Sequence, residues 1–157
     1  VTSPPPPRYE NIAEYRVQGL EATARYSPTE TLSMFVGGTW IPDRAPTNLP
    51  YAPEWSASAG LNWRFLNAFR LSLDALWQAR QYTANTRVPE YGGSSIAEVG
   101  GFFLLNGKLS WDFKVRSPGL SGEIFLAGEN LTDANYAYKK DYPMPGIAAM
   151  AGVNLKF

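Results

Sequence analysis

The last eleven residues of the chain, 147–157, alternate between apolar side chains and side chains that are mostly polar or small. The apolar set, counted back from the end, is Phe157, Leu155, Val153, Ala151, Ala149 and Ile147. The alternate set is Lys156, Asn154, Gly152, Met150 and Ala148. Because successive side chains of a β-strand point to opposite sides, this period of two predicts a strand with one apolar face.

The same alternation recurs along most of the chain, whereas helical periodicity is hard to find. In the segment 55–65, for example, Trp55, Leu61 and Trp63 share one side and Ser58 and Asn62 share the other. The pattern predicts an all-β protein, with a loop over residues 1–12 and seven antiparallel strands. The predicted strands lie near 14–26, 31–40, 55–65, 69–82, 102–115, 122–131 and 147–157.

The predicted connections alternate in length. Those near 27–30, 66–68 and 116–121 are short, and those near 41–54, 83–101 and 132–146 are long. Short turns would therefore gather at one end of the sheet and long loops at the other. Transmembrane β-barrels have this arrangement.

Strand length and aromatic spacing decide between a membrane barrel and a soluble β-sandwich. Strands of globular proteins usually have about 5–6 residues, and transmembrane strands need about 9–11. The aromatic residues of one face recur eight residues apart, as in Trp55 and Trp63, which corresponds to a rise of roughly 20 Å. We therefore predict an antiparallel transmembrane barrel segment with a lipid-facing aromatic girdle, and the alternative is a sandwich with these residues in its core. The girdle residues are Trp40, Trp55, Trp63, Trp77 and Trp111.

Composition excludes several functions. The chain of 157 residues has neither Cys nor His, which removes disulfides, thiolate chemistry, Ser-His catalysis and the commonest metal ligand. The net charge is zero, so nothing indicates nucleic acid as a partner. No run of 18 apolar residues predicts a membrane-spanning helix. We expect no enzymatic activity, no metal site and no cofactor.

Two segments before the last predicted strand form a recognisable pattern. Asn130, Leu131, Thr132 and Asp133 are followed three residues later by Tyr136, and then comes the run Tyr142, Pro143, Met144, Pro145 and Gly146. Upstream stand Gly19-Leu20-Glu21 and Leu49-Pro50, followed by Pro53. In this order, and ending on Phe157, these segments resemble the C-terminal part of TonB-dependent outer-membrane receptors.

The residues of the pattern also have a physical interpretation. Asn130 and Asp133 suit a turn at a strand end, because their side chains bond local backbone and tolerate unusual backbone angles. Pro143 and Pro145 stiffen the approach to the final strand, and Gly146 permits a change of direction. These roles are structural rather than catalytic.

The resemblance implies that the chain supplies about seven strands of a larger, probably 22-stranded barrel in the outer membrane of a Gram-negative bacterium. Such receptors import a scarce solute, for example an iron–siderophore complex or cobalamin. The implied partners are outer-membrane lipid, the remaining strands and plug domain, TonB, the barrel-assembly machinery and the metal chelate or cobalamin. Neither the plug nor the TonB-contacting segment, the TonB box, can be placed in this chain. Val153, Leu155 and Phe157 would form the barrel-insertion signal.

Other interpretations stay open at this stage. Arg87 and Tyr91 lie in the long connection 83–101 and could touch a ligand from an extracellular loop, although a plain surface loop is as good an explanation. Two alternatives to the transporter are a soluble β-sandwich binding module and a small complete outer-membrane barrel. The second would need one more strand, and the first ten residues are too rich in proline to supply it.

Overall fold

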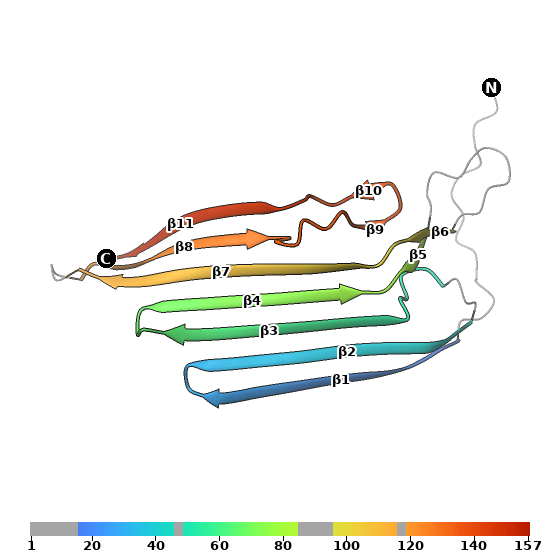
Figure 1. Ribbon diagram of the computed structural model, residues 1–157, viewed down its shortest axis with the longest axis horizontal. Coiled ribbons are helices and arrows are strands. Elements are labelled where there is room, and N and C mark those ends of the chain that lie inside the picture. Colours follow the sequence, from blue (N-terminus) through green and yellow to red (C-terminus); the bar gives the residue numbers. More distant parts are fainter. Residues whose placement is uncertain (1–15, 46–48, 85–95, 116–118) are drawn as a thin grey trace, which may run out of the picture.

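The chain folds into one antiparallel sheet of seven strands in a computed structural model that describes residues 16–45, 49–84, 96–115 and 119–157. The strand order is β1-β2-β3-β4-β7-β8-β11, so each strand lies beside its neighbour along the chain (Figure 1). The seven strands are β1 (Arg16–Thr29), β2 (Leu32–Ala45), β3 (Trp55–Phe65), β4 (Phe69–Gln78), β7 (Phe102–Lys114), β8 (Ser121–Glu129) and β11 (Ala148–Lys156). Two small hairpins pair β5 (Gln81–Ala84) with β6 (Ile96–Val99), and β9 (Ala137–Lys139) with β10 (Tyr142–Pro143).

The strand bounds differ from the sequence-based ranges mainly at the ends of the first two strands. β1 continues to Thr29 and β2 to Ala45, past the predicted ends at 26 and 40. Both are longer because they form one regular ladder through Gly37 and Gly38, with register shifts only near Gly19 and between Tyr26 and Thr29. The other strands end within one or two residues of the predicted bounds, except the fourth.

The predicted strand 69–82 is wrong beyond its tenth residue. β4 ends at Gln78, and Gln81 begins a separate hairpin strand. The chain can turn away here because Gly101, the residue just before β7, has no side chain. An added Cβ at Gly101 would lie 2.7 Å from the Gln78 carbonyl oxygen. Neither small hairpin was predicted.

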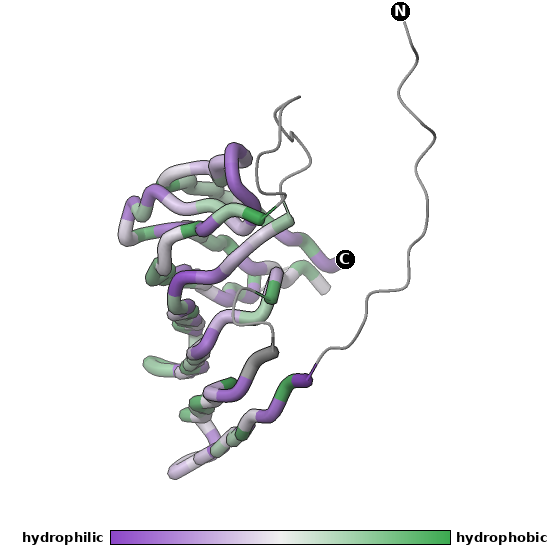
Figure 2. Tube along the Cα trace, turned by 90° about the vertical axis from the view of Figure 1, so that its right-hand side faces the viewer, coloured by the Kyte–Doolittle hydropathy of each residue, from purple (hydrophilic) through white to green (hydrophobic). Residues whose placement is uncertain are grey.

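The seven-stranded sheet is a single curved layer (Figure 2). Among the described residues its strands contact only their neighbours in the sheet, and no second sheet packs on either face. The β-sandwich alternative is therefore wrong. β1 and β11 do not contact each other in the described part of the chain, so the sheet does not close and the small complete barrel is wrong as well. No helix of the described segments is long and apolar enough to cross a membrane.

The register brings the alternating side chains of all strands into common rows. One row joins Leu32, Trp63, Leu71, Leu109, Leu126 and Ala151 from β2 to β11. The next row joins Ser33, Asn62, Ser72, Lys108, Ala127 and Met150. We call the side of the first row the apolar face and the side of the second row the polar face. Since a slip of one residue would exchange the two, the register fixes both.

The two ends of the sheet differ. Short connections gather at one end, which we call the turn end. There the three residues 66–68 join β3 to β4, and Leu66 and Asn67 both have positive φ angles. The long connections and both small hairpins gather at the other end, which we call the loop end (Figure 1). This agrees with the alternation of connection lengths predicted from the sequence.

Candidate functional site

The apolar face carries two bands of aromatic side chains. Towards the loop end, Trp40 and Trp55 stack with ring centroids 5.2 Å apart, and Trp77 lies opposite Phe103. Towards the turn end a continuous series of ring contacts, each at 4.8–6.5 Å, runs from β3 to β7. Its members are Trp63, Phe65, Phe69, Trp111 and Phe113. The five predicted girdle tryptophans all lie on this face and remain 38–44% exposed.

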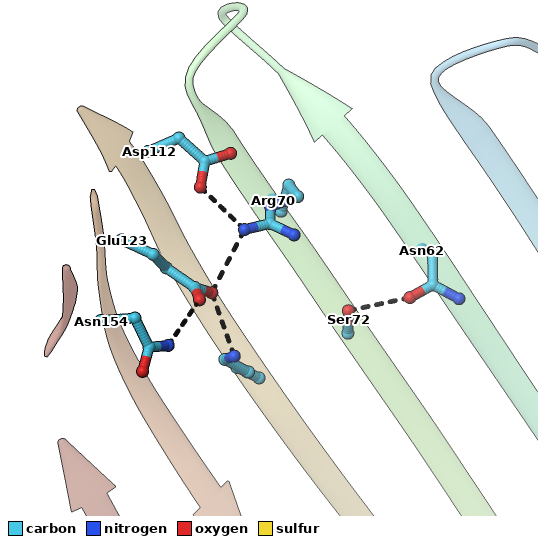
Figure 3. A network of polar contacts seen from close by, with 7 residues as sticks. Asn62, Arg70, Ser72, Asp112, Glu123 and Asn154 are labelled. Carbon is cyan, nitrogen blue, oxygen red and sulfur yellow. Dashed lines mark hydrogen bonds and ion pairs between the residues drawn. The ribbon is translucent and has the colours of Figure 1, made fainter. Parts of the chain in front are cut away.

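The polar face carries a network of charged and amide side chains centred on Glu123 (Figure 3). Its carboxylate lies 3.3 Å from the Arg70 guanidinium and 3.0 Å from the Lys108 ammonium, and it accepts a hydrogen bond of 2.9 Å from Asn154. Arg70 also donates to Asp112 at 2.7 Å. These residues come from β4, β7, β8 and β11, so the network links four strands through their side chains.

Phenylalanine rings on the polar face lie over cross-strand glycines. Phe35 of β2 is opposite Gly60 of β3, and Phe125 of β8 is opposite Gly152 of β11. A Cβ at Gly60 or Gly152 would come within 2.5 Å of the facing ring. The Lys108 ammonium stands 4.3 Å from the centre of the Phe125 ring, within cation–π distance. The rings thus lie flat against the polar face of the sheet and leave the space above that face to polar groups.

Asn130 organises the turn that follows β8. Its side chain is 4% exposed, and its Oδ1 accepts from the Ala134 amide while its Nδ2 donates to the carbonyls of Ala134 and Pro145. Its own amide donates to Asn106 Oδ1 of β7. The φ angle of Asn130 is +49°, a left-handed conformation that asparagine tolerates. This one side chain therefore joins the end of β8 to the segment that leads into β11.

Asp133 and Gly146 complete the same turn. Asp133 has a φ of +48°, and its Oδ1 accepts from the Ile147 amide at 3.1 Å. A Cβ at Gly146 would approach that oxygen to 3.0 Å. The turn interpretation of Asn130 and Asp133 thus agrees with their positive φ angles, whereas Gly146 does not have a positive φ.

Leu131 has a role that the sequence did not reveal. Gly107 of β7 and Gly128 of β8 are opposite each other, and Leu131 covers both. A Cβ at Gly128 would lie 2.5 Å from Leu131 Cδ2, and one at Gly107 would lie 3.4 Å from Cδ1. Leu131 thus fills the gap that the glycine pair leaves on the apolar face.

At the loop end, three connections that are distant in sequence pack together. Gln81 donates to the Tyr138 carbonyl, and the Thr83 hydroxyl, which is fully buried, accepts from the Lys140 amide. The Tyr51 amide donates to the Tyr82 carbonyl. No local pattern could have revealed this packing, because its partners lie up to 57 residues apart.

An aromatic cluster stands beside these hairpins. Phe102 contacts Tyr136 and Tyr138 with ring centroids 4.8 and 5.3 Å apart, and the two tyrosines meet edge to face. Burial, and then the proximity of Tyr136, raises the pKa of Tyr138. Tyr136 of the predicted pattern therefore packs rather than pointing into solvent. Tyr142 and Pro143 form β10, with the Lys139 ammonium 5.0 Å from the Tyr142 ring.

The remaining predicted residues lie apart from these clusters. Val153 and Leu155 are exposed on the apolar face of the edge strand β11, and Phe157 beyond it is 99% exposed. Arg87 and Tyr91 lie outside the described residues, so their predicted ligand contact remains a prediction. In the described segments no group of three or more His, Cys, Asp or Glu side chains could hold a metal ion.

Comparison with known proteins places this sheet in a family. The family model described as TonB dependent receptor-like, beta-barrel matches residues 1–131. The chain belongs to the TonB-dependent receptor β-barrel family. Residues 132–157, which hold the second half of the sequence pattern, lie outside that match. Members of this family are transporters, so the expectation of no enzymatic activity agrees with it.

A solved structure supports the fold. The sheet is similar to the crystal structure of the ferric citrate transporter FecA in the unliganded form, with a TM-score of 0.65 and 21% sequence identity. The similarity covers 91% of this chain and 24% of the FecA chain, so the chain spans about a quarter of that transporter's length. No curated protein matches the sequence.

Proposed function

We propose that this chain forms part of the wall of an outer-membrane transporter that imports a scarce solute with energy delivered through TonB. Membership of the TonB-dependent receptor family carries this proposal. An iron–siderophore complex or cobalamin is the proposed class of solute. The proposed location is the outer membrane of a Gram-negative bacterium.

In this role the apolar face contacts lipid and the polar face lines the lumen. The two aromatic bands support the orientation, because they bracket the apolar rows of the sheet as the interfacial girdles of a membrane barrel do. The polar face supports it too, since ion pairs such as Arg70 with Asp112 are stable in a hydrated lumen and would be costly in lipid. The loop end would face outwards, where the connection holding Arg87 and Tyr91 could reach the solute.

The open sheet needs further strands on both sides. β1 and β11 each have one edge without a strand partner among the described residues. In lipid every unsatisfied backbone group costs several kcal/mol, so these edges must pair with other segments. The proposed partners are the remaining strands of the barrel, with a plug domain in the lumen that TonB engages.

The last strand is the proposed recognition element for the barrel-assembly machinery. Val153 and Leu155 lie on one exposed face of the edge strand, and Phe157 follows them. Deletion of Phe157 from the full-length receptor should reduce the amount of heat-modifiable barrel in the outer membrane. An unchanged yield would contradict this role.

Uptake measurements test the transport proposal. The gene for the full-length receptor is deleted from its host, and uptake of labelled iron–siderophore complexes and cobalamin is compared with that of the complemented strain. We expect the receptor deletion to abolish uptake of one class of solute. A TonB deletion or a protonophore should abolish the same uptake. If uptake of every solute is unchanged, or persists without TonB and the proton gradient, the proposal is wrong.

A further inference from the structure

Five basic side chains lie on the polar face near the turn end. Three carboxylates, Glu30, Asp112 and Glu123, accompany them. The basic side chains, which we call the basic cluster, are Arg64, Arg70, Lys108, Lys114 and Lys156. Most of them line a groove of about 710 Å³ that extends from β3 to β11.

The two carboxylates that line the groove, Asp112 and Glu123, already form ion pairs. Asp112 pairs with Arg70 at 2.7 Å, and Glu123 pairs with Arg70 and Lys108 at 3.3 and 3.0 Å. The other three basic residues form no ion pair with any residue that the structure describes, and all three are exposed. These residues are Arg64, Lys114 and Lys156. The groove therefore carries positive charge that the wall does not balance.

The register concentrates this excess positive charge, because it places basic residues close to one another. Arg64 is directly opposite Arg70, and Lys114 and Lys156 both lie opposite Ser121 from its two sides. Like charges on directly opposed strand positions are destabilising. In addition, Arg70 Nε is buried and has no hydrogen-bond partner. An external group with negative charge would relieve the repulsion between these like charges.

We propose that the basic cluster is the docking site for a carboxylate-bearing segment of the domain that occupies the lumen. This inference rests on the proposed function, which places that domain against the polar face. The width of the cluster favours a protein segment over a small anion. Arg64 and Lys156 stand four strand spacings apart, roughly 19 Å, which is more than one small anion can bridge. About six extended residues with two or three Asp or Glu side chains span that distance.

Zero-length cross-linking tests the contact directly. A carbodiimide joins a lysine amine to a carboxylate that lies within ion-pair distance, so Lys114 and Lys156 act as built-in probes. The full-length receptor is treated in outer-membrane fragments and its cross-linked peptides are identified by mass spectrometry. We expect Lys114 or Lys156 to be joined to Asp or Glu of the lumenal domain. If both lysines are unmodified, or joined only to Asp112, Glu123 or another protein, the inference is overturned.

A charge-neutralising variant gives an independent measurement. Arg64→Gln, Lys114→Gln and Lys156→Gln are combined, and the matched control combines Arg16→Gln, Arg80→Gln and Lys140→Gln near the loop end. We expect the lumenal domain of the first variant to be cleaved by added protease about threefold faster than in wild type, and that of the control at the wild-type rate. Equal rates in all three proteins would overturn the inference.

The two proposals fail in distinguishable ways. If neither cross-link nor cleavage responds while TonB-dependent uptake persists, the docking site is wrong and the transport function stands. If uptake never depends on TonB, the transport function itself is wrong. Heat-modifiable migration of each variant shows whether its barrel has folded.

Discussion

The two faces of the seven-stranded sheet are built from the same strands but held by different kinds of interaction. On the apolar face, rows such as Leu71, Leu109 and Leu126 meet through non-directional contacts, and Leu109 and Leu126 remain exposed to the surroundings of the sheet. On the polar face, Glu123 and its partners depend on distances near 3 Å between four strands. The apolar face therefore tolerates changes of shape but not of polarity, and for the polar face the reverse holds.

The sharpest test of this contrast places the same charge on adjacent residues of one strand. Ala59 is midway between Trp55 and Trp63 on the apolar face, and Ser58 beside it is on the polar face. Ala59→Arg should lower the free energy of unfolding of the full-length receptor in lipid vesicles by about 2–4 kcal/mol. Ser58→Arg should change it far less, because its side chain enters the lumen. Urea titration followed by tryptophan fluorescence measures both, and equal losses would show that the faces are not distinguished by lipid.

A second test concerns the turn that follows β8. Asn130→Ala removes the bonds to Ala134 and Pro145, leaves their backbone groups without a partner, and puts alanine at a φ of +49°. We expect a loss of about 2–3 kcal/mol in the same assay. Asn135→Ala, five residues later in the same connection, is the control. A loss of under 0.5 kcal/mol for Asn130→Ala would mean that the connection holds its shape without this side chain.

A third test asks where shape does matter on the apolar face. Gly128→Ala places a Cβ 2.5 Å from Leu131 Cδ2 and should displace Leu131, at about 1–2 kcal/mol. Gly100→Ala is the matched control, since a Cβ there meets nothing within 4 Å. The double variant Gly128→Ala with Leu131→Ala should recover part of the loss. If it does not, the contact between Leu131 and Gly128 is not the cause.

The smallest expected effect belongs to the stacked pair Trp40 and Trp55 of the aromatic bands. A double-mutant cycle with Trp40→Leu and Trp55→Leu should give an interaction free energy of about 0.5–1.5 kcal/mol. Trp40 with Trp111 provides a control pair, because they lie in different bands and should show no coupling. Equal coupling in both pairs would indicate a general destabilisation rather than ring stacking.

Residues with a local signal could be predicted, and those with distant partners could not. The alternation over 55–65 predicted β3 with its bounds, and the residue types of Asn130 and Asp133 predicted the turn in which both have positive φ angles. In contrast, Leu131 was known only as part of a pattern, and its contact with Gly107 depends on the register of β7 and β8. The hairpins β5–β6 and β9–β10 were missed, because each is only two to four residues per strand and depends on the other for burial.

The sequence by itself determined which side chains share a face, because the two-residue period of a strand is a property of the local backbone. It also determined the alternation of short and long connections, and through them the two unlike ends of the sheet. Only the tertiary structure decided which strands lie side by side in which register. That decision opposed Arg64 to Arg70, brought Glu123 to Lys108 and covered two glycines with Leu131. Such pairings depend on contacts between segments tens of residues apart, and no periodicity in a single sequence reveals contacts of that kind.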